Sequence, residues 1–213
     1  LVTDSIITNN SITADLYAHT GGALHIKGSA VAERCLIAYN TAESRSDNPS
    51  HMAGGPAGVL INSTTAIVRD CTIVENVAQA VGGIGFNAKG LVTNSIVCRN
   101  IAYRNAAPAG TYQGSHMFRN CALDAEGLHD ATFTNYTGII DFADPAAGDW
   151  RPRLTSIAYR DGDAAGAFKR LPASTPTCDL SAVVKAGLAP FDATFVAATE
   201  AFGEATLSYT WHF

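Results

Sequence analysis

The chain has 213 residues, of which only 15% are charged, with a net charge of −5 and no cluster of basic residues. This balance excludes the positively charged footprint of a nucleic-acid-binding protein, so we expect no nucleic-acid partner. No apolar run approaches the roughly 18 residues of a membrane-spanning helix, which predicts no membrane span in this segment. Leu1 lies in mid-repeat with no signal sequence before it, and we expect the chain to be a piece of a longer protein.

Four stretches repeat one pattern, in which a small residue and aliphatic residues alternate and an Asn follows. They cover residues 4–10, 34–40, 70–76 and 94–100. The closing Asn residues are 30, 36 and 24 positions apart, so the shortest interval suits one coil and the longer ones contain loops. Each stretch is predicted to be a short strand that ends at a corner, with the Asn in left-handed backbone conformation. The repeat therefore predicts stacked parallel β-coils.

A glycine-marked segment precedes three of these strands, at residues 21–26, 58–62 and 82–87. Its regular distance from the strand that follows makes it the second half of each repeat.

Alternation along the strands predicts which side chains point inward. Three columns would stack between coils: Val2, Ala32, Val68 and Val92; Ser5, Cys35, Cys71 and Ser95; and Ile7, Ile37, Ile73 and Val97. The residues between these columns are expected to face water. A structural ladder of hydrogen-bonded amides is expected from Asn10, Asn40, Asn76 and Asn100. Cys35 and Cys71 share a column in which parallel Cβ directions suit a disulfide poorly, so we expect free, buried thiols.

The segment Asp70-Cys71-Thr72-Ile73-Val74-Glu75-Asn76, together with the Gly-Gly-aliphatic segments, resembles the repeats of right-handed parallel β-helix proteins of the pectin-lyase-like class. This class includes bacterial surface proteins and polymorphic-membrane-protein-type adhesins. The resemblance covers residues 1–125 and implies an all-β fold, a right-handed parallel β-helix solenoid. Polysaccharide lyases, glycoside hydrolases and non-enzymatic adhesins share this scaffold, so the fold alone does not imply an activity.

Residues 126–168 are predicted to form a C-terminal cap on the β-helix. Asp141-Phe142-Ala143-Asp144-Pro145 and Gly148-Asp149-Trp150-Arg151 are similar to the terminal signature of secreted bacterial β-helix proteins described as choice-of-anchor proteins. Ile157 stands where that signature usually has a Pro. Because this stretch is rich in turn residues around Trp150, we expect it to cover the last open coil.

A third part begins after a Pro-, Ser- and Thr-rich linker at residues 169–177. Residues 178–184 and 191–197 alternate like strands, and Tyr209-Thr210-Trp211-His212-Phe213 resembles a strand of polycystic-kidney-disease (PKD) type immunoglobulin-like domains. In that family an Asp stands at the position of His212. Residues 178–213 are therefore predicted to be a partial immunoglobulin-like β-sandwich. Since such a sandwich needs about seven strands, we expect the rest of the chain or a neighbouring surface to complete it.

Candidate binding residues lie in the insertions that follow the Asn corners, at residues 11–20, 41–56 and 101–115, with His116 just beyond the last of them. They are Tyr17, His19, Arg45, His51, Tyr103, Arg104, Tyr112 and His116. Because the coils stack in register, these insertions are expected to share one edge of the solenoid and to form a glycan-binding strip. The alternative is that solvated loops simply contain such residues.

No catalytic or metal-binding residue is predicted in this segment. Glycoside hydrolysis needs two carboxylates about 5–9.5 Å apart, whereas the outward column of Asp4, Arg34, Asp70 and Asn94 alternates and indicates a surface ladder. No Cys-x-x-Cys pair exists, so no zinc site is predicted. No cofactor is expected, and oxygen-rich turns with Asp141, Asp144 and Asp149 leave calcium as the alternative.

Taken together, these features favour a structural or adhesive module of a secreted or cell-surface bacterial protein that forms part of a larger extracellular assembly. Its expected partners are other protein chains or the remainder of the same chain, and also polysaccharide. The alternatives are a polysaccharide lyase or glycoside hydrolase of the β-helix class, or a glycan-binding module.

Overall fold

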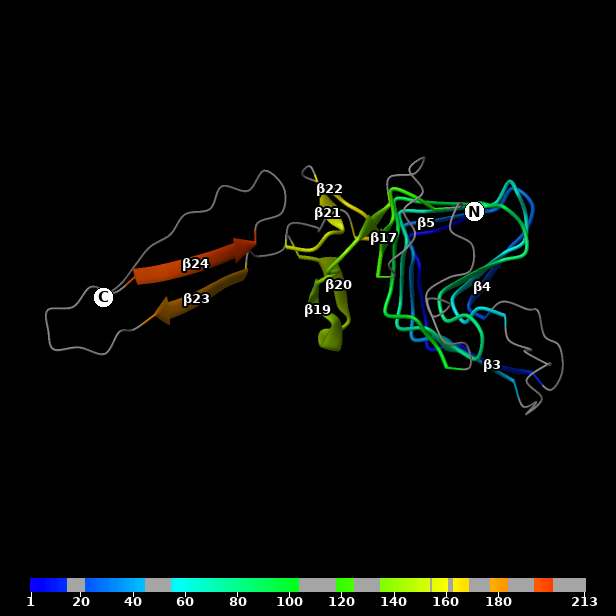
Figure 1. Ribbon diagram of the computed structural model, residues 1–213, viewed down its shortest axis with the longest axis horizontal. Helices are drawn as coiled ribbons and strands as arrows, with labels where there is room; N and C mark the ends of the chain where they lie inside the picture. The colour runs from blue at the N-terminus through cyan, green and yellow to red at the C-terminus, as the bar shows by residue number, and fades with distance from the viewer. Residues whose placement is uncertain are drawn as a thin grey trace, which may run out of the picture. The chain divides into compact units, whose positions relative to one another are not determined.

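The computed structural model describes residues 1–14, 22–44, 55–103, 118–124, 135–153, 155–160, 163–168, 177–183 and 194–200. The chain divides into two compact units, Leu1–Lys169 and Arg170–Phe213. The first unit is a parallel β-helix solenoid, whose successive coils run from blue to green in Figure 1.

Each coil contributes strands to up to four parallel sheets. Sheet A contains β1 (Val2–Thr3), β5 (Val31–Glu33), β9 (Ile67–Arg69), β13 (Leu91–Thr93) and β16 (Phe118–Arg119). Sheet B contains β2 (Ile6–Thr8), β6 (Leu36–Ala38), β10 (Thr72–Val74), β14 (Ile96–Cys98), β17 (Ala122–Leu123) and β18 (Tyr136–Thr137). Sheet C contains β3 (Ser11–Ala14), β7 (Thr41–Ser44), β11 (Val77–Ala78) and β15 (Ile101–Ala102). Sheet D contains β4 (Leu24–Ile26), β8 (Val59–Ile61) and β12 (Ile84–Phe86). We number the rungs of the solenoid from 1 to 5 by their sheet A strands.

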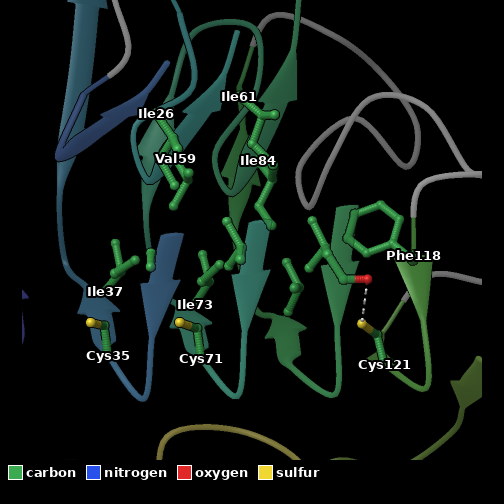
Figure 2. Packing of buried hydrophobic residues seen from close by; sticks show 14 of the residues in the cluster. Ile26, Cys35, Ile37, Val59, Ile61, Cys71, Ile73, Ile84, Phe118 and Cys121 are labelled. Atoms are coloured by element: carbon green, nitrogen blue, oxygen red, sulfur yellow. Dashed lines mark hydrogen bonds between the residues drawn. The ribbon is translucent and has the colours of Figure 1, made fainter. Parts of the chain in front are cut away.

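The register confirms the inward columns predicted from alternation. Val68 of rung 3 pairs with Ala32 below it and Val92 above it. Ile73 pairs in the same way with Ile37 and Val97. Figure 2 shows the isoleucines of sheets B and D meeting inside the coil, where most of these side chains are fully buried. Burial of such columns, at about 25 cal/mol per Å² of apolar surface, is the main term that holds the rungs together.

Left-handed backbone occurs one residue before the predicted position. At the corner between sheets B and C the residues with positive φ are Asn9, Tyr39, Glu75 and Arg99. At the corner between sheets A and B the residues with positive φ are Asp4, Arg34, Asp70, Asn94 and Asn120. A left-handed residue turns the chain so that the following side chain enters the coil, which places the closing Asn inside and not at the exposed apex. Each such residue costs roughly 1–2 kcal/mol of backbone strain.

The closing Asn side chains bond to one another along the solenoid. Asn40 donates from its backbone N–H and from Nδ2 to Oδ1 of Asn76, at 3.0 and 2.8 Å. Asn76 makes the same two bonds to Asn100, at 3.0 and 2.9 Å. Each Nδ2 also reaches a strand carbonyl, as Asn76 does to Ile37 O at 2.9 Å. These bonds satisfy the corner backbone and offset the strain of the left-handed residues.

Glycine in the second half of the repeat is explained by close backbone approach between rungs. A Cβ on Gly58 would lie 2.5 Å from the carbonyl oxygen of Gly83 in the next rung. Near this corner the core narrows to the small side chains of Ala42, Ala57 and Ala78. Only a residue without a side chain fits there.

A second apolar layer covers the outer face of sheet B. It is built from residues 138–153, 155–160 and 163–168. These contain β19 (Phe142–Asp144), the 3-10 helix η2 (Pro145–Ala147), β20 (Asp149–Pro152), β21 (Tyr159–Arg160) and β22 (Asp163–Ala164). Phe142 and Trp150 of this layer, which we call the flank cover, pack with the outward side chains Leu36, Val74 and Ile96. The expectation that residues between the inward columns face water is therefore wrong for rungs 2 to 5 of sheet B, because the flank cover buries them, whereas Ile6 of rung 1 is exposed.

The contacts of the flank cover run along the side of the solenoid. Gly166 N–H donates to Asn94 O at 3.0 Å, and Ala167 N–H donates to the Thr72 hydroxyl at 3.0 Å. The segment thus lies along the side of the solenoid, whereas its sequence predicts a cover for the last open coil. Strand β18 also continues sheet B past residue 125, where the coils were expected to end.

The second unit contains an antiparallel pair of strands, β23 (Thr177–Val183) and β24 (Thr194–Glu200). These strands overlap the predicted strands over 178–184 and 191–197, and the second one begins at Thr194 among the described residues.

Candidate functional site

Three insertions leave the solenoid from one edge. Sheet C strands pair in register, with Ser11 opposite Thr41, Thr41 opposite Val77 and Val77 opposite Ile101. The chain continues from the carboxyl ends of β3, β7 and β15 into residues 15–21, 45–54 and 104–117, while rung 3 passes directly to sheet D. Parallel strands end at the same edge, so the three insertions begin close together. We call this place the loop edge.

Tyr103 is the one predicted glycan-binding residue that the described part of the chain contains. It follows β15, its N–H donates to Ala78 O at 3.1 Å, and its side chain is 52% exposed. The other seven lie outside the described residues: Tyr17, His19, Arg45, His51, Arg104, Tyr112 and His116.

The outward face of sheet C presents hydroxyl, carboxylate and aromatic groups beside the loop edge. In the column of Tyr103, Gln79 is buried, whereas Glu43 and Thr13 are exposed. In the neighbouring column the Thr41 hydroxyl donates to Ser11 Oγ at 2.9 Å, and Ile101 is exposed. An exposed ring flanked by hydrogen-bonding groups suits contact with an amphipathic polymer such as a polysaccharide.

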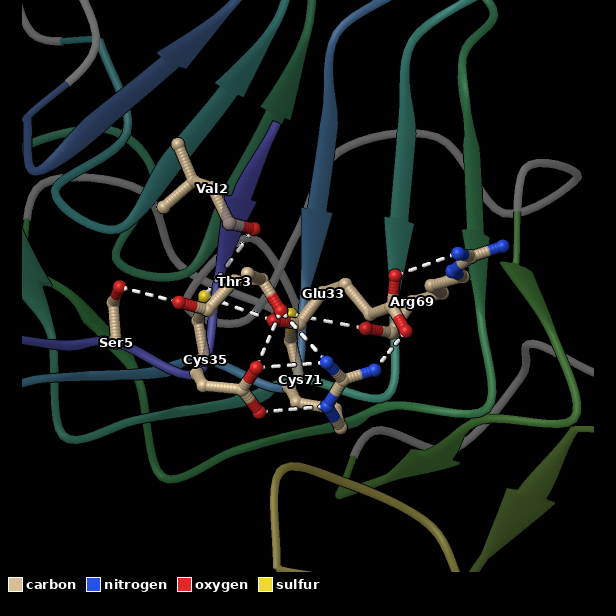
Figure 3. Close-up of polar contacts among 9 residues, drawn as sticks. Val2, Thr3, Ser5, Glu33, Cys35, Arg69 and Cys71 are labelled. Carbon is tan, nitrogen blue, oxygen red and sulfur yellow. Dashed lines mark hydrogen bonds and ion pairs between the residues drawn. The ribbon is translucent and has the colours of Figure 1, made fainter.

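Carboxylates at the corner between sheets A and B are paired with cations and amides. Arg34 contacts both oxygens of Asp4, at 2.6 and 2.7 Å, and Glu33 links Arg34 to Arg69 (Figure 3). Hydrogen bonds from Arg34 and Thr3 lower the pKa of Asp4 to about 2. Asn94 donates to Asp70 at 2.7 Å. This arrangement is a surface ladder in which a carboxyl held at low pKa is a poor general acid.

The Ser and Cys column, predicted only to stack inside the coil, forms a second hydrogen-bonded ladder. Ser95 Oγ donates to Thr93 O at 2.8 Å, and Cys71 Sγ donates to Arg69 O at 3.2 Å, two residues earlier in each case. The backbone N–H of Cys71 donates to Ser95 Oγ at 3.1 Å. The sequence feature that indicates this hydrogen bonding is a small side chain that can both donate and accept a hydrogen bond, at the same position of each rung.

Among the residues whose side chains the structure describes, four cysteines are free and buried: Cys35, Cys71, Cys98 and Cys121. Hydrogen bonding between neighbouring thiols raises the pKa of Cys71 and lowers that of Cys35, and burial raises the pKa of Cys121 to about 12. Cys98 faces outward beneath the flank cover, where burial raises its pKa. Because the thiols are enclosed, they are not exposed nucleophiles.

The oxygen-rich turns of the flank cover have internal partners. Asp141 lies 3.6 Å from Arg153, Asp149 pairs with Arg151, and Asp144 accepts the N–H of Ala147 at 3.1 Å. No group of three or more potential metal ligands occurs among the described residues.

His25 lies on sheet D with a buried Nε2 that has no hydrogen-bond partner among the described residues. Burial, together with the charge of Lys27, lowers the pKa of His25, which keeps the imidazole neutral near pH 7.

No family model, curated protein or solved structure matches the chain. Within the described residues, no helix is long and apolar enough to cross a membrane.

Proposed function

We propose that the chain is a structural or adhesive module of a secreted or cell-surface bacterial protein, within a larger extracellular assembly. The observation that carries the proposal is the loop edge, where three insertions begin at the same edge of sheet C, two from the neighbouring rungs 1 and 2 and the third from rung 4. The scaffold beneath them is held together by stacked core and amide columns. A rigid repeat that presents adjacent loops is a common way to build an extended binding surface.

The pectin-lyase-like resemblance of the repeats supports this surface role, and the PKD-like motif at Tyr209–Phe213 adds a second module type of the kind found in exported proteins. Strands β23 and β24 are compatible with the start of an immunoglobulin-like sandwich, because they form one antiparallel pair. We propose polysaccharide as the ligand of the loop edge, with Tyr103 as a stacking residue.

The test is a panel of plant, algal and bacterial polysaccharides on which both retention and the release of reducing or unsaturated ends are measured, with and without calcium. In separate variants, insertions 15–21, 45–54 and 104–117 are each replaced by a short Gly-Ser linker. The control replaces the exposed turn Asn62–Thr65, which lies away from the loop edge. The proposal is supported if the chain retains a polysaccharide without cleaving it and if replacing any of the three insertions abolishes this retention. Turnover on any polysaccharide would instead favour the lyase or hydrolase alternative.

A finer variant pair tests Tyr103. Tyr103→Ala removes an exposed ring beside the loop edge, whereas Ile139→Ala removes an exposed apolar side chain of the flank cover. Weaker retention by Tyr103→Ala alone places the ligand at the loop edge, and equal retention by both variants excludes Tyr103 from the contact.

A further inference from the structure

Two thiols lie next to each other inside the coil, one on rung 2 and the other on rung 3. Cys35 and Cys71 occupy the same position of the Ser and Cys column, directly before the paired strands β6 and β10. Thr72 N–H donates to Cys35 O at 2.9 Å, which holds the two cysteines in register. Both side chains are fully buried, and Figure 2 shows their sulfurs pointing the same way from adjacent rungs.

The two thiols interact directly. A hydrogen bond joins the side chains of Cys35 and Cys71, and each Sγ lies 3.2 Å from the carbonyl oxygen two residues before it. Cys121 belongs to the same column, but Ser95 of rung 4 lies between it and Cys71. Among the described residues of this column, Cys35 and Cys71 are therefore the one pair of neighbouring thiols.

The distance between rungs decides how two such sulfurs can be joined. Adjacent strands of a sheet lie about 4.8 Å apart. A disulfide needs Cβ atoms about 3.8 Å apart and sulfurs about 2 Å apart, so side chains in register suit it poorly. A metal–thiolate bond is about 2.3 Å long, so an ion with two opposite thiolate ligands holds their sulfurs about 4.6 Å apart. The rung spacing thus matches a metal bridge and not an S–S bond.

The ligand set indicates which ion fits. Thiolates are soft ligands that select Cu(I) over hard cations such as Mg²⁺ or Ca²⁺. Cu(I) takes two ligands in line, whereas a structural zinc ion takes four in a tetrahedron. Two thiolates also compensate the charge of a cation inside an apolar core. A pair of sulfurs on opposite sides of one point is therefore a site for Cu(I).

We propose that Cys35 and Cys71 bind one Cu(I) ion between rungs 2 and 3, with the two sulfurs as its opposite ligands. Each thiol loses its proton to solvent as its sulfur bonds to copper, and copper stays in the +1 state, so no oxidant or reductant takes part. The sulfurs lie one residue beyond the corner between sheets A and B, where Arg34 is exposed. The ion enters when this corner opens or when the chain folds around it.

The experiment measures copper binding by the reduced 213-residue chain without oxygen, against a coloured chelator that buffers Cu(I). Copper is added to the folded chain and, in a second series, during refolding from urea. Cys178 is replaced by Ser in every sample, because its side chain lies outside the described part of the chain. Copper per chain after gel filtration and the ultraviolet absorption of the copper–thiolate bond are the readouts.

Serine substitutions separate the pair from the other thiols. Cys35→Ser and Cys71→Ser each remove one ligand, whereas Cys121→Ser removes a buried thiol of the same column that lies beside a serine. Since Ser5 and Ser95 already occupy this column, serine fits the coil, and circular dichroism checks that each variant is folded. Ser95→Cys gives four consecutive thiols, so it is expected to raise the copper bound from one to two ions per chain.

One copper ion per chain, bound at least about tenfold more weakly by Cys35→Ser and Cys71→Ser but not by Cys121→Ser, supports the proposal. Failure to retain copper by either route overturns it. Equal retention by Cys35→Ser and Cys121→Ser also overturns it, because the ion then lies elsewhere. An unchanged copper content in Ser95→Cys would show that neighbouring thiols of the column are not sufficient, and it counts against the bridge.

Discussion

Oδ1 of Asn40 accepts two hydrogen bonds from Asn10 of the preceding rung, one from its backbone N–H at 3.0 Å and one from its Nδ2 at 2.9 Å. One amide oxygen thus satisfies a corner of the backbone and a side chain together. Because the same pair of bonds recurs at Asn40 and Asn76, the ladder joins the rungs at a corner where the backbone has left-handed residues. These hydrogen bonds hold the corner in its strained left-handed conformation, which burial of apolar surface alone would not determine.

Asn76→Leu is expected to destabilise the solenoid by about 3 kcal/mol. The change removes the Nδ2 bonds to Asn100, Ile37 O and Val74 O. It also removes the oxygen that accepts from Asn40, so the buried backbone N–H of Asn40 loses its acceptor and Asn40 Nδ2 keeps only its bond to Ile7 O. Urea unfolding followed by circular dichroism measures the loss. Asn10→Leu is the control, with an expected cost of about 1 kcal/mol because its side chain is exposed and lies at the end of the ladder. Equal costs for the two variants would contradict the ladder as a stabilising element.

Trp150→Ala is expected to cost about 3–5 kcal/mol and to loosen the flank cover. Trp150 is fully buried against Phe142, with Cys98 in the same apolar cluster, whereas Cys71 belongs to the core of the coil. Maleimide labelling in native buffer, mapped by mass spectrometry, is expected to modify Cys98 in the variant and to leave Cys71 protected. Ile139→Ala is the control. Labelling of Cys71 together with Cys98 would show that the coil and the flank cover unfold as one unit.

Serine substitutions separate the two environments of cysteine. Cys121→Ser is expected to change the unfolding free energy by less than about 1 kcal/mol, because Cys121 Sγ donates to Arg119 O and Ser95 makes the same bond in the neighbouring rung. Cys98→Ser is expected to cost about 1–3 kcal/mol, because it places a hydroxyl in the apolar cluster under the flank cover. Denaturant unfolding midpoints of the two variants measure these costs. A larger loss of stability for Cys121→Ser than for Cys98→Ser would contradict the hydrogen-bonding role of Cys121 and the apolar environment of Cys98.

The columns of the solenoid could be predicted because alternation is a local property of the sequence. Val68 and Ile73 are β-branched residues at positions of period two, and their neighbours in adjacent rungs are of like type. The left-handed corners were displaced by one residue in the prediction because Tyr39 and Arg99 are not residue types that favour this conformation. The flank cover depends on contacts across about a hundred residues, such as Thr72 with Ala167. Apolar Leu36 and Ile96 in a column expected to face water were the available signal.

The candidate site was less predictable than the fold. Insertion lengths placed the loops, and the register of sheet C shows that they begin at one edge. The residue types within the insertions cannot fix a ligand, because exposed Tyr, His and Arg side chains are also ordinary for solvated loops. Of the predicted set, only the exposure of Tyr103 follows from the described structure.

Protonation of Asp4 is expected to weaken the first corner only in strong acid. Its pKa in the folded chain is about 2, below the ordinary value of 3.8, because Arg34 bonds both carboxylate oxygens. Because the pKa of Asp4 is lower in the folded chain than in the unfolded chain, the ionised carboxylate stabilises the fold. This stabilisation is complete above the unfolded-state pKa of about 3.8 and is lost as the pH falls from about 3.8 to the folded-state pKa of about 2. Carboxyl NMR titration of the chain measures the shift. Arg34→Gln is expected to return the pKa toward its ordinary value, and Arg153→Gln, which contacts Asp141 instead, is the control. Since the Asp4–Arg34 pair is exposed, added salt is expected to shift the pKa in the same direction as Arg34→Gln, and a pKa that neither change moves would show that another group holds the charge.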